Sequence, residues 1–186
     1  MSRWPPDTAR RLKASALTLF AERGFANVTA AEVAAGAGMT ERTFFRHFRA
    51  KEDVLFEDYS GVKDDLVAAV AAAPPSASAR ELMQAAANFL SGRFESEREM
   101  LRVFATVVDE EPTLRARAAL RDREWGEAIA TVFAGRGFPQ ARAAMLAATM
   151  AATFRLAFDA WVGDDDARKP AERFAWALEA LGEALR

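Results

Sequence analysis

The chain has 186 residues, a formal net charge of −2 and no cysteine. This length suffices for one or two domains with a substantial core. Without thiols, disulfide scaffolds and thiolate metal sites are excluded, and one histidine, His47, argues against a multi-histidine metal centre. The composition is rich in alanine and other helix formers, which favours an all-α fold.

The average charge hides a strong asymmetry along the chain. Residues 1–51 hold nine Lys/Arg and four Asp/Glu, a net of +5, whereas residues 52–186 hold 16 and 23, a net of −7. A basic module can neutralise phosphates, and an acidic body stays clear of a polyanion. The charges alone are equally compatible with a chance fluctuation in surface composition.

The N-terminus lacks the apolar core of a signal peptide. No segment reaches the roughly 18 uninterrupted apolar residues that a membrane span needs. We therefore expect a cytoplasmic protein with no membrane partner.

The first helix is predicted from Pro6 or Asp7 to Arg23, because apolar residues recur there at helical spacing. Gly24 is expected to end it at a left-handed position, and Phe25 is expected to fold back onto it.

A second helix is predicted after a capping box formed by Thr29 and Glu32. Gly36 and Gly38 follow, where a positive φ or a close backbone approach is inexpensive only for glycine. These residues predict a short helix that ends in a tight turn.

A third helix is predicted from Glu41 to Phe48, capped by Thr40. Phe44 and Phe48 are four residues apart and are expected to form a buried pair. Two short helices joined by a glycine turn, the second rich in polar and basic side chains, are typical of a helix-turn-helix.

The rest of the chain predicts further helices. One begins near Lys51 and extends to about Ala72, and the Pro-rich segment 74–78 interrupts the pattern. Ser78 and Glu81 form a second capping box. Later helices are predicted at about 78–94, 100–110, 112–133, 140–161 and 170–185.

The helix at 140–161 is apolar almost all round, so it must be buried on two sides. One side can face its own domain, and the other can face a partner subunit in a four-helix bundle. The alternative is the central helix of a monomeric bundle.

From about Pro6 to Tyr59 the chain resembles the DNA-binding head of TetR-family transcriptional regulators. The resemblance implies a DNA-binding domain of three helices at 1–51 and a ligand-binding and dimerisation bundle at 52–186. It implies about nine helices in all. It also implies a homodimer that forms through the last two helices. The matching segments are Leu12…Phe20-Ala21-Glu22-Arg23-Gly24-Phe25, Val28-Thr29-Ala30-Ala31-Glu32-Val33-Ala34, Gly38-Met39-Thr40-Glu41-Arg42-Thr43-Phe44-Phe45-Arg46-His47-Phe48 and Lys51-Glu52-Asp53-Val54-Leu55.

By the resemblance, the third helix and its surroundings carry the DNA contacts. Arg42 and Thr43 lie nearest the bases, and Phe45 replaces a tyrosine, which favours an apolar base contact over a phosphate hydrogen bond. Lys51 is expected to meet a phosphate at a helix N-terminus. The complete set of predicted DNA contacts is Thr29, Glu41, Arg42, Thr43, Phe45, Arg46, His47 and Lys51.

The acidic body is predicted to bind a small hydrophobic or amphipathic effector through adaptable apolar side chains. Arg155 and Asp159 can form an ion pair within one helix, or Arg155 can receive a carboxylate. Plain core is the alternative for each candidate. The candidates are Phe89, Phe104, Trp125, Met150, Phe154, Arg155 and Phe158.

Together these features predict a ligand-responsive regulator, a repressor that its effector releases from a palindromic operator. Its partners are double-stranded DNA, the effector and a second copy of the chain. We predict no cofactor, no metal and no enzymatic activity, because the sequence has no thiol, one histidine, no Gly-rich phosphate loop and no metal-ligand cluster. The rival interpretation is a helical adaptor that uses a degenerate helix-turn-helix for protein contacts.

Overall fold

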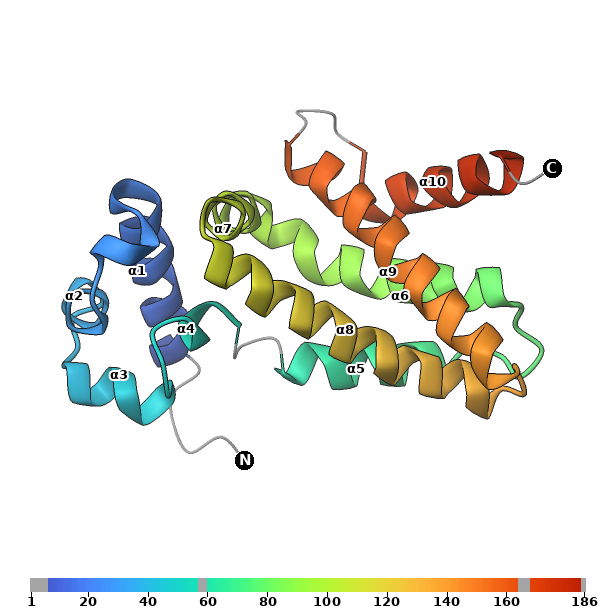
Figure 1. Ribbon diagram of the computed structural model, residues 1–186, viewed down its shortest axis with the longest axis horizontal. Helices are drawn as coiled ribbons and strands as arrows, with labels where there is room; N and C mark the ends of the chain where they lie inside the picture. The colour runs from blue at the N-terminus through green and yellow to red at the C-terminus, as the bar shows by residue number, and fades with distance from the viewer. Residues whose placement is uncertain (1–6, 57–59, 164–167, 185–186) are drawn as a thin grey trace. The chain divides into compact units, whose positions relative to one another are not determined.

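The computed structural model in Figure 1 describes residues 7–56, 60–163 and 168–184. Every regular element in these ranges is helical, which confirms the all-α fold. The predicted fourth helix is described as two segments, α4 (Asp53–Phe56) and α5 (Ser60–Ala71). Residues 57–59 between them lie outside the described residues, and so does Tyr59 of the family resemblance.

The chain divides into two compact units. The first comprises residues 1–61 and 99–118, and the second comprises residues 62–98 and 119–186. The first unit therefore draws on two separate stretches of sequence. The functional division at residue 51, by contrast, stays a prediction.

The first unit begins with α1 (Asp7–Arg23), as predicted. Gly24 has a φ of 79°, and its N–H donates to the carbonyl of Phe20 at 2.9 Å. The 3₁₀ turn η1 (Phe25–Asn27) then places the Phe25 ring edge-on to Phe20, with 5.0 Å between the ring centroids. The predicted stop and the fold-back of Phe25 are both confirmed.

The helix-turn-helix follows as α2 (Ala30–Gly36) and α3 (Glu41–His47). The hydrophobic core around the helix-turn-helix is not built by α1 to α4 alone. Apolar side chains of α7 (Arg98–Glu110) and of the first turns of α8 (Pro112–Gly135) belong to the same buried cluster. They are Phe104, Val107, Val108, Leu114 and Ala118.

The second unit is built from α5, α6 (Ala79–Phe94), the later part of α8, α9 (Gln140–Gly163) and α10 (Pro170–Ala184). Helix α10 packs against both α9 and α6. The capping box of Ser78 and Glu81 at the start of α6 is confirmed. The short 3₁₀ turn η3 (Glu95–Glu97) follows α6.

Two arginines stabilise helix ends in the second unit. The Arg136 guanidinium donates to the carbonyls of Ala71, Ala73 and Pro74 at 2.6–2.7 Å, which satisfies acceptors at the end of α5 and just after it. Arg98 donates to the Trp161 carbonyl at 2.7 Å, near the end of α9.

Among the helices of the described residues, α9 is the one that is long and apolar enough to cross a membrane. The expectation from sequence differed, because Arg142, Arg155 and Asp159 break its apolar run. The core helix of a soluble protein can be as long and as apolar as α9.

Candidate nucleic-acid interface

The start of α2 is fixed by the predicted capping box. Thr29 Oγ1 accepts from the Glu32 N–H at 3.2 Å, and Glu32 Oε2 accepts from the Thr29 N–H at 2.8 Å. Arg23 adds an ion pair with Glu32 at 2.7 Å. Hydrogen bonds from the Thr29 backbone and then its hydroxyl, with Arg23 adding to them, lower the pKa of Glu32 from 4.5 to about 2.

The turn between α2 and α3 uses its two glycines in different ways. Gly38 has a φ of 69°, so it occupies the left-handed conformation. Gly36 is needed for space instead, because a Cβ there would lie 2.4 Å from Ser15 Oγ on α1. Arg11, also on α1, donates to the carbonyl of Ala37 at 2.7 Å.

Helix α3 rests on buried aromatic side chains. Thr40 caps it by accepting from the Thr43 N–H at 3.2 Å. Phe44 and Phe48 are buried with their ring centroids 5.2 Å apart, which confirms the predicted pair. The helix ends at His47, one residue earlier than predicted, because Phe48 has extended backbone angles.

The opposite side of α3 faces solvent. Glu41, Arg42, Phe45 and Arg46 are exposed. Phe45 is 51% exposed and stands edge-on to the Phe44 ring at 5.4 Å. A large exposed phenylalanine next to two arginines is an apolar contact surface within a basic one.

Two other predicted contacts on α3 are half-buried. Thr43 shares a hydrogen bond with the Thr40 hydroxyl at 3.1 Å. Burial, and secondarily the charge of Arg46, lowers the pKa of His47 from 6.5, which favours the neutral imidazole.

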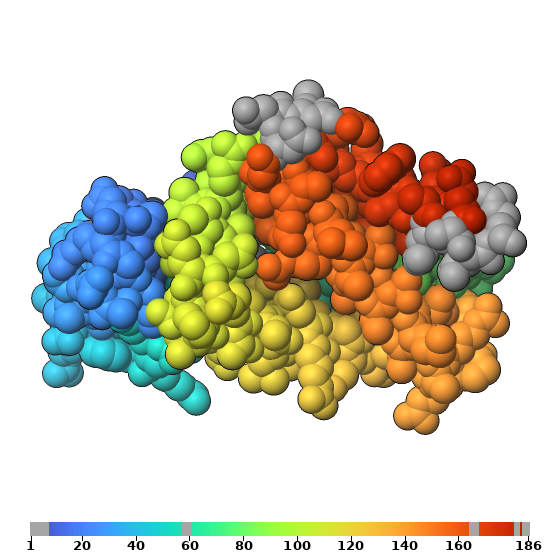
Figure 2. All heavy atoms as spheres, turned by 45° about the horizontal axis from the view of Figure 1, so that its top comes forward, coloured from blue at the N-terminus to red at the C-terminus, as the bar shows by residue number. Residues whose placement is uncertain are grey.

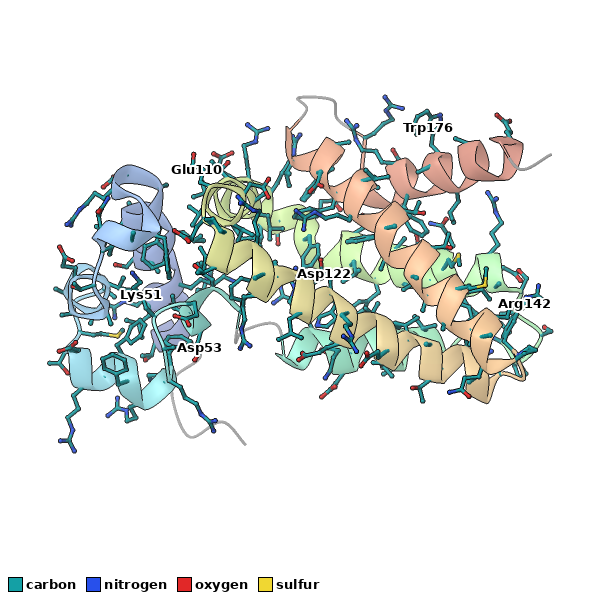
Figure 3. All side chains as sticks on the ribbon, viewed as in Figure 1. Lys51, Asp53, Glu110, Asp122, Arg142 and Trp176 are labelled. Carbon is teal, nitrogen blue, oxygen red and sulfur yellow. The ribbon has the colours of Figure 1, made fainter. Side chains whose placement is uncertain are left out.

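Two predicted DNA contacts have partners within the protein. The exposed Thr29 is engaged in the capping box, and its hydroxyl also donates to Glu32 at 2.8 Å. Lys51, labelled within the head in Figure 3, donates from Nζ to the carbonyls of Phe25 and Val28 at 2.6 and 2.8 Å. Their contacts with DNA stay predictions.

Several predicted effector contacts of the second unit lie in one aromatic cluster. The half-buried Phe158 has Phe94, Phe154 and Trp161 within 6.0–6.4 Å, measured between ring centroids. Phe154 also stands 6.2 Å from Phe174 of α10. Met150 is buried and Phe89 is half-buried on neighbouring helices.

Three other effector candidates have different surroundings. Phe104 belongs to the first unit, where it packs edge-on against Phe56 at 5.8 Å. The guanidinium of Arg121 lies 5.7 Å from the Trp125 ring. Arg155 forms the predicted pair with Asp159 at 2.9 Å.

Sequence reasoning missed the roles of Arg11 and Arg136. Each reaches a backbone carbonyl at least 26 residues away, and no spacing rule detects a contact of that kind. Every residue has a backbone carbonyl, so the sequence does not indicate which carbonyl an arginine side chain will reach. Only the folded structure shows that contact.

Comparison with known proteins gives these elements a context. Residues 12–57 match the family model "Bacterial regulatory proteins, tetR family". The chain is 28% identical over 135 residues to the transcriptional regulator TcmR of Streptomyces glaucescens, covering 69% of this chain and 60% of TcmR. It is 26% identical over 181 residues to the putative mycofactocin biosynthesis transcriptional regulator MftR of Mycobacterium tuberculosis, covering 96% and 91%.

Solved structures share the fold over nearly the whole chain. Thermus thermophilus FadR, a repressor in complex with lauroyl-CoA, matches with a TM-score of 0.62 and 24% identity, covering 96% of this chain and 95% of FadR. The multidrug-binding protein EbrR, complexed with malachite green, matches with a TM-score of 0.60 and 21% identity, covering 96% and 98%. TcmR and MftR are transcriptional regulators by name, and residues 12–57 of this chain match the TetR family of bacterial regulatory proteins.

Proposed function

We propose that the chain is a DNA-binding transcriptional regulator whose helix α3 enters the major groove. The observation that carries this proposal is the two-sided character of α3. Phe44 anchors one side in the core, while Glu41, Arg42, Phe45 and Arg46 are exposed on the other. A major groove admits one α-helix, and such side chains reach base edges and phosphates.

The exposed residues have distinct chemical roles in this proposal. Arg42, at the N-terminal end of α3, reads a base edge, whereas Arg46, one turn later, neutralises a phosphate. Phe45 lacks a hydroxyl, so its exposed ring suits the methyl group of a thymine. Glu41 accepts from a cytosine amine or stabilises the helix N-terminus.

A gel shift with the DNA that flanks the protein's own coding region tests this function most directly. We expect Arg46→Ala to weaken binding to all sequences and to flatten its salt dependence. Arg42→Ala should in addition relax base preference, at a cost of about 1–3 kcal/mol for the preferred base pair. The adaptor alternative predicts instead that no duplex binds, at low salt or high.

The chain acts as a dimer in this proposal, with a second copy covering the exposed apolar side chains of α9 and α10. Met145 and Leu156 on α9 are 70% and 69% exposed, and Trp176 on α10 is 64% exposed. Figure 2 shows α9 and α10 (orange to red) side by side on one face, and Trp176 points outward in Figure 3. Burial of such side chains stabilises an isologous interface.

Leu156→Glu tests the interface, and Leu120→Glu on α8 is its matched control because Leu120 is also exposed, at 48%. We expect sedimentation to show a dimer for the wild type and the control, and a monomer for Leu156→Glu. Flotation of the wild type with lipid vesicles would instead assign α9 to a membrane.

A two-fold dimer fits a palindromic operator with half-sites about one helical turn apart.

The proposed effector is a small hydrophobic or amphipathic molecule, and the regulator is a repressor that the effector releases. The aromatic cluster around Phe158 supplies a polarisable apolar environment. Related structures hold lauroyl-CoA and malachite green. An effector that prefers a conformer unable to bind DNA shifts the population away from the operator complex.

A thermal-shift assay with lauroyl-CoA and malachite green tests the effector class. Stabilisation by these amphipathic probes, and release of bound DNA at the same concentrations, would support it. The proposal fails if only small, highly charged ligands raise the melting temperature.

A further inference from the structure

The ammonium of Lys51 occupies a closed environment within the head. Nζ donates to the carbonyls of Phe25 and Val28 at 2.6 and 2.8 Å, and it lies 3.9 Å from the centroid of the Phe25 ring. An ammonium has three N–H donors. Two of them serve carbonyls, and an aromatic face covers the charge.

The charges around Lys51 are unfavourable for a phosphate. The carboxylates of Glu52 and Glu111 act electrostatically on its ammonium, and both would repel a DNA backbone. Burial still lowers the pKa of Lys51 below 10.5, which reflects a partly desolvated site rather than an open one. A phosphate would have to displace internal acceptors that already compensate this charge.

The carbonyls that Lys51 binds lead directly into α2. Val28 precedes the N-cap residue Thr29, and Phe25 begins the turn η1. Lys51 itself follows α3, so it joins the segment before α2 to the segment after α3. The two helices of the DNA-binding motif are therefore held between its contacts.

Arg11 makes the corresponding contact at the other end of α2. Its guanidinium donates at 2.7 Å to the carbonyl of Ala37, the C-cap residue of α2. The same group lies 3.3 Å from where a Cβ of Gly38 would be. Arg11 thus ties α1 to the turn that sets the direction of α3.

We propose that Lys51 and Arg11 are positioning residues for DNA recognition, which hold the two ends of α2 through backbone carbonyls and contact no phosphate. This inference rests on the proposed function, since positioning matters only if α3 reads DNA. It reverses the expectation from sequence that Lys51 neutralises a phosphate.

Binding measurements over a range of salt concentrations separate the two roles. The probe is a duplex that the wild-type chain selects from a random-sequence pool. Lys51→Met and Arg11→Met keep much of the apolar stem, and each should weaken binding about tenfold without changing the salt slope. Arg49→Met and Arg10→Met are charge-matched controls, because both residues are exposed and neither makes a hydrogen bond to the described part of the chain.

Arg46→Met is the positive control, which should reduce the salt slope by about one for each subunit. A slope reduction of that size in Lys51→Met would overturn the positioning role and restore the phosphate contact. The positioning role would also be overturned if Arg49→Met and Arg10→Met bound DNA as weakly as Lys51→Met and Arg11→Met. The loss of charge alone would then explain the weaker binding.

Amide hydrogen exchange of the full-length protein without DNA gives an independent test. Lys51→Met should accelerate exchange at Asn27 and Val28, and Arg11→Met should accelerate it at Gly38 and Met39, whose N–H groups bond within the turns. Unchanged exchange overturns the proposal even if the protein binds no DNA. If exchange changes as expected but the wild type binds no duplex, the proposed function fails and the structural role stands.

Lys51→Arg serves if the methionine variant does not fold. A phosphate contact tolerates this change, since a guanidinium binds phosphate well. The closed site requires a compact ammonium, so we expect weaker binding with an unchanged salt slope. Binding equal to that of the wild type would overturn the proposal.

Discussion

Replacing Gly36 by alanine should reveal how tightly α1 and α2 pack. The new Cβ would lie 2.4 Å from Ser15 Oγ, far closer than van der Waals contact allows, while the next atoms, of Leu19 and Ser15, are 3.7 Å away. The conflict therefore involves one hydroxyl. That hydroxyl donates to the Val33 carbonyl at 2.8 Å, so moving it breaks a hydrogen bond between the helices.

The expected magnitude follows from two opposed effects. Overpacking typically costs about 1–3 kcal/mol. Alanine gains about 1 kcal/mol over glycine inside a helix. We expect Gly36→Ala to destabilise the wild type by about 1 kcal/mol, as overpacking of about 2 kcal/mol exceeds that gain. In a Ser15→Ala background only ordinary 3.7 Å contacts remain, so the same change should stabilise by up to about 1 kcal/mol.

The double-mutant cycle is measured by urea unfolding, with the slope m checked for constancy across the four proteins. Ser15→Ala alone should cost little, because the Val33 carbonyl also accepts from the Ala37 N–H at 3.2 Å. A change of sign between backgrounds is the expected result. If Gly36→Ala has the same effect in both backgrounds within about 0.5 kcal/mol, the close approach of the two helices is refuted.

Three further predictions use other contacts. Because folding lowers the pKa of Glu32 from 4.5 to about 2, the carboxylate stabilises the fold above pH 4.5. The loss of unfolding free energy in Glu32→Gln, measured in urea, should therefore shrink as the pH falls toward 2. A loss that does not depend on pH would contradict this. If His47 binds a phosphate, DNA binding raises the pKa of this histidine, which burial lowers in the free protein. DNA binding should then strengthen below pH 7 in the wild type but not in His47→Gln. Fluorescence anisotropy of labelled DNA measures the difference. Arg136→Met should lower the free energy of unfolding in urea by about 2 kcal/mol. Arg123→Met, whose pair with Glu127 is exposed, should change it little. Equal losses in the two variants would argue against the cap.

Local chemistry explains why the head was predictable from sequence. The capping box of Thr29 and Glu32, the cap at Thr40 and the left-handed Gly38 depend on neighbours within a few residues. Spacing alone therefore located α2 and α3. The buried pair of Phe44 and Phe48 followed from the same helical period, although Phe48 itself lies just beyond the helix.

Long-range packing explains what sequence could not locate. Phe104 has the same apolar character as Phe154, and nothing nearby indicates that one packs with Phe56 while the other joins an aromatic cluster of α9 and α10. The pairing of Arg155 with Asp159 was predictable because both belong to one helix. The contact of Arg11 with Ala37 was not, because 26 residues separate them.

The cations of the head illustrate how structure refines a charge argument. Residues 1–51 hold nine Lys/Arg, yet Lys13 is buried, Arg23 pairs with Glu32, and Arg11 and Lys51 serve backbone carbonyls. The exposed cations of α3 are Arg42 and Arg46.

Arg42 and Arg46 in each of two subunits correspond to a slope of about −4 for the logarithm of the binding constant against the logarithm of salt concentration. All nine would give about −16. A measured slope near the second value would show that the engaged cations exchange their internal partners for phosphates on binding. A slope near the first value would show that the basic charge of the head serves both to build the DNA-binding motif and to bind DNA, with different residues in each role.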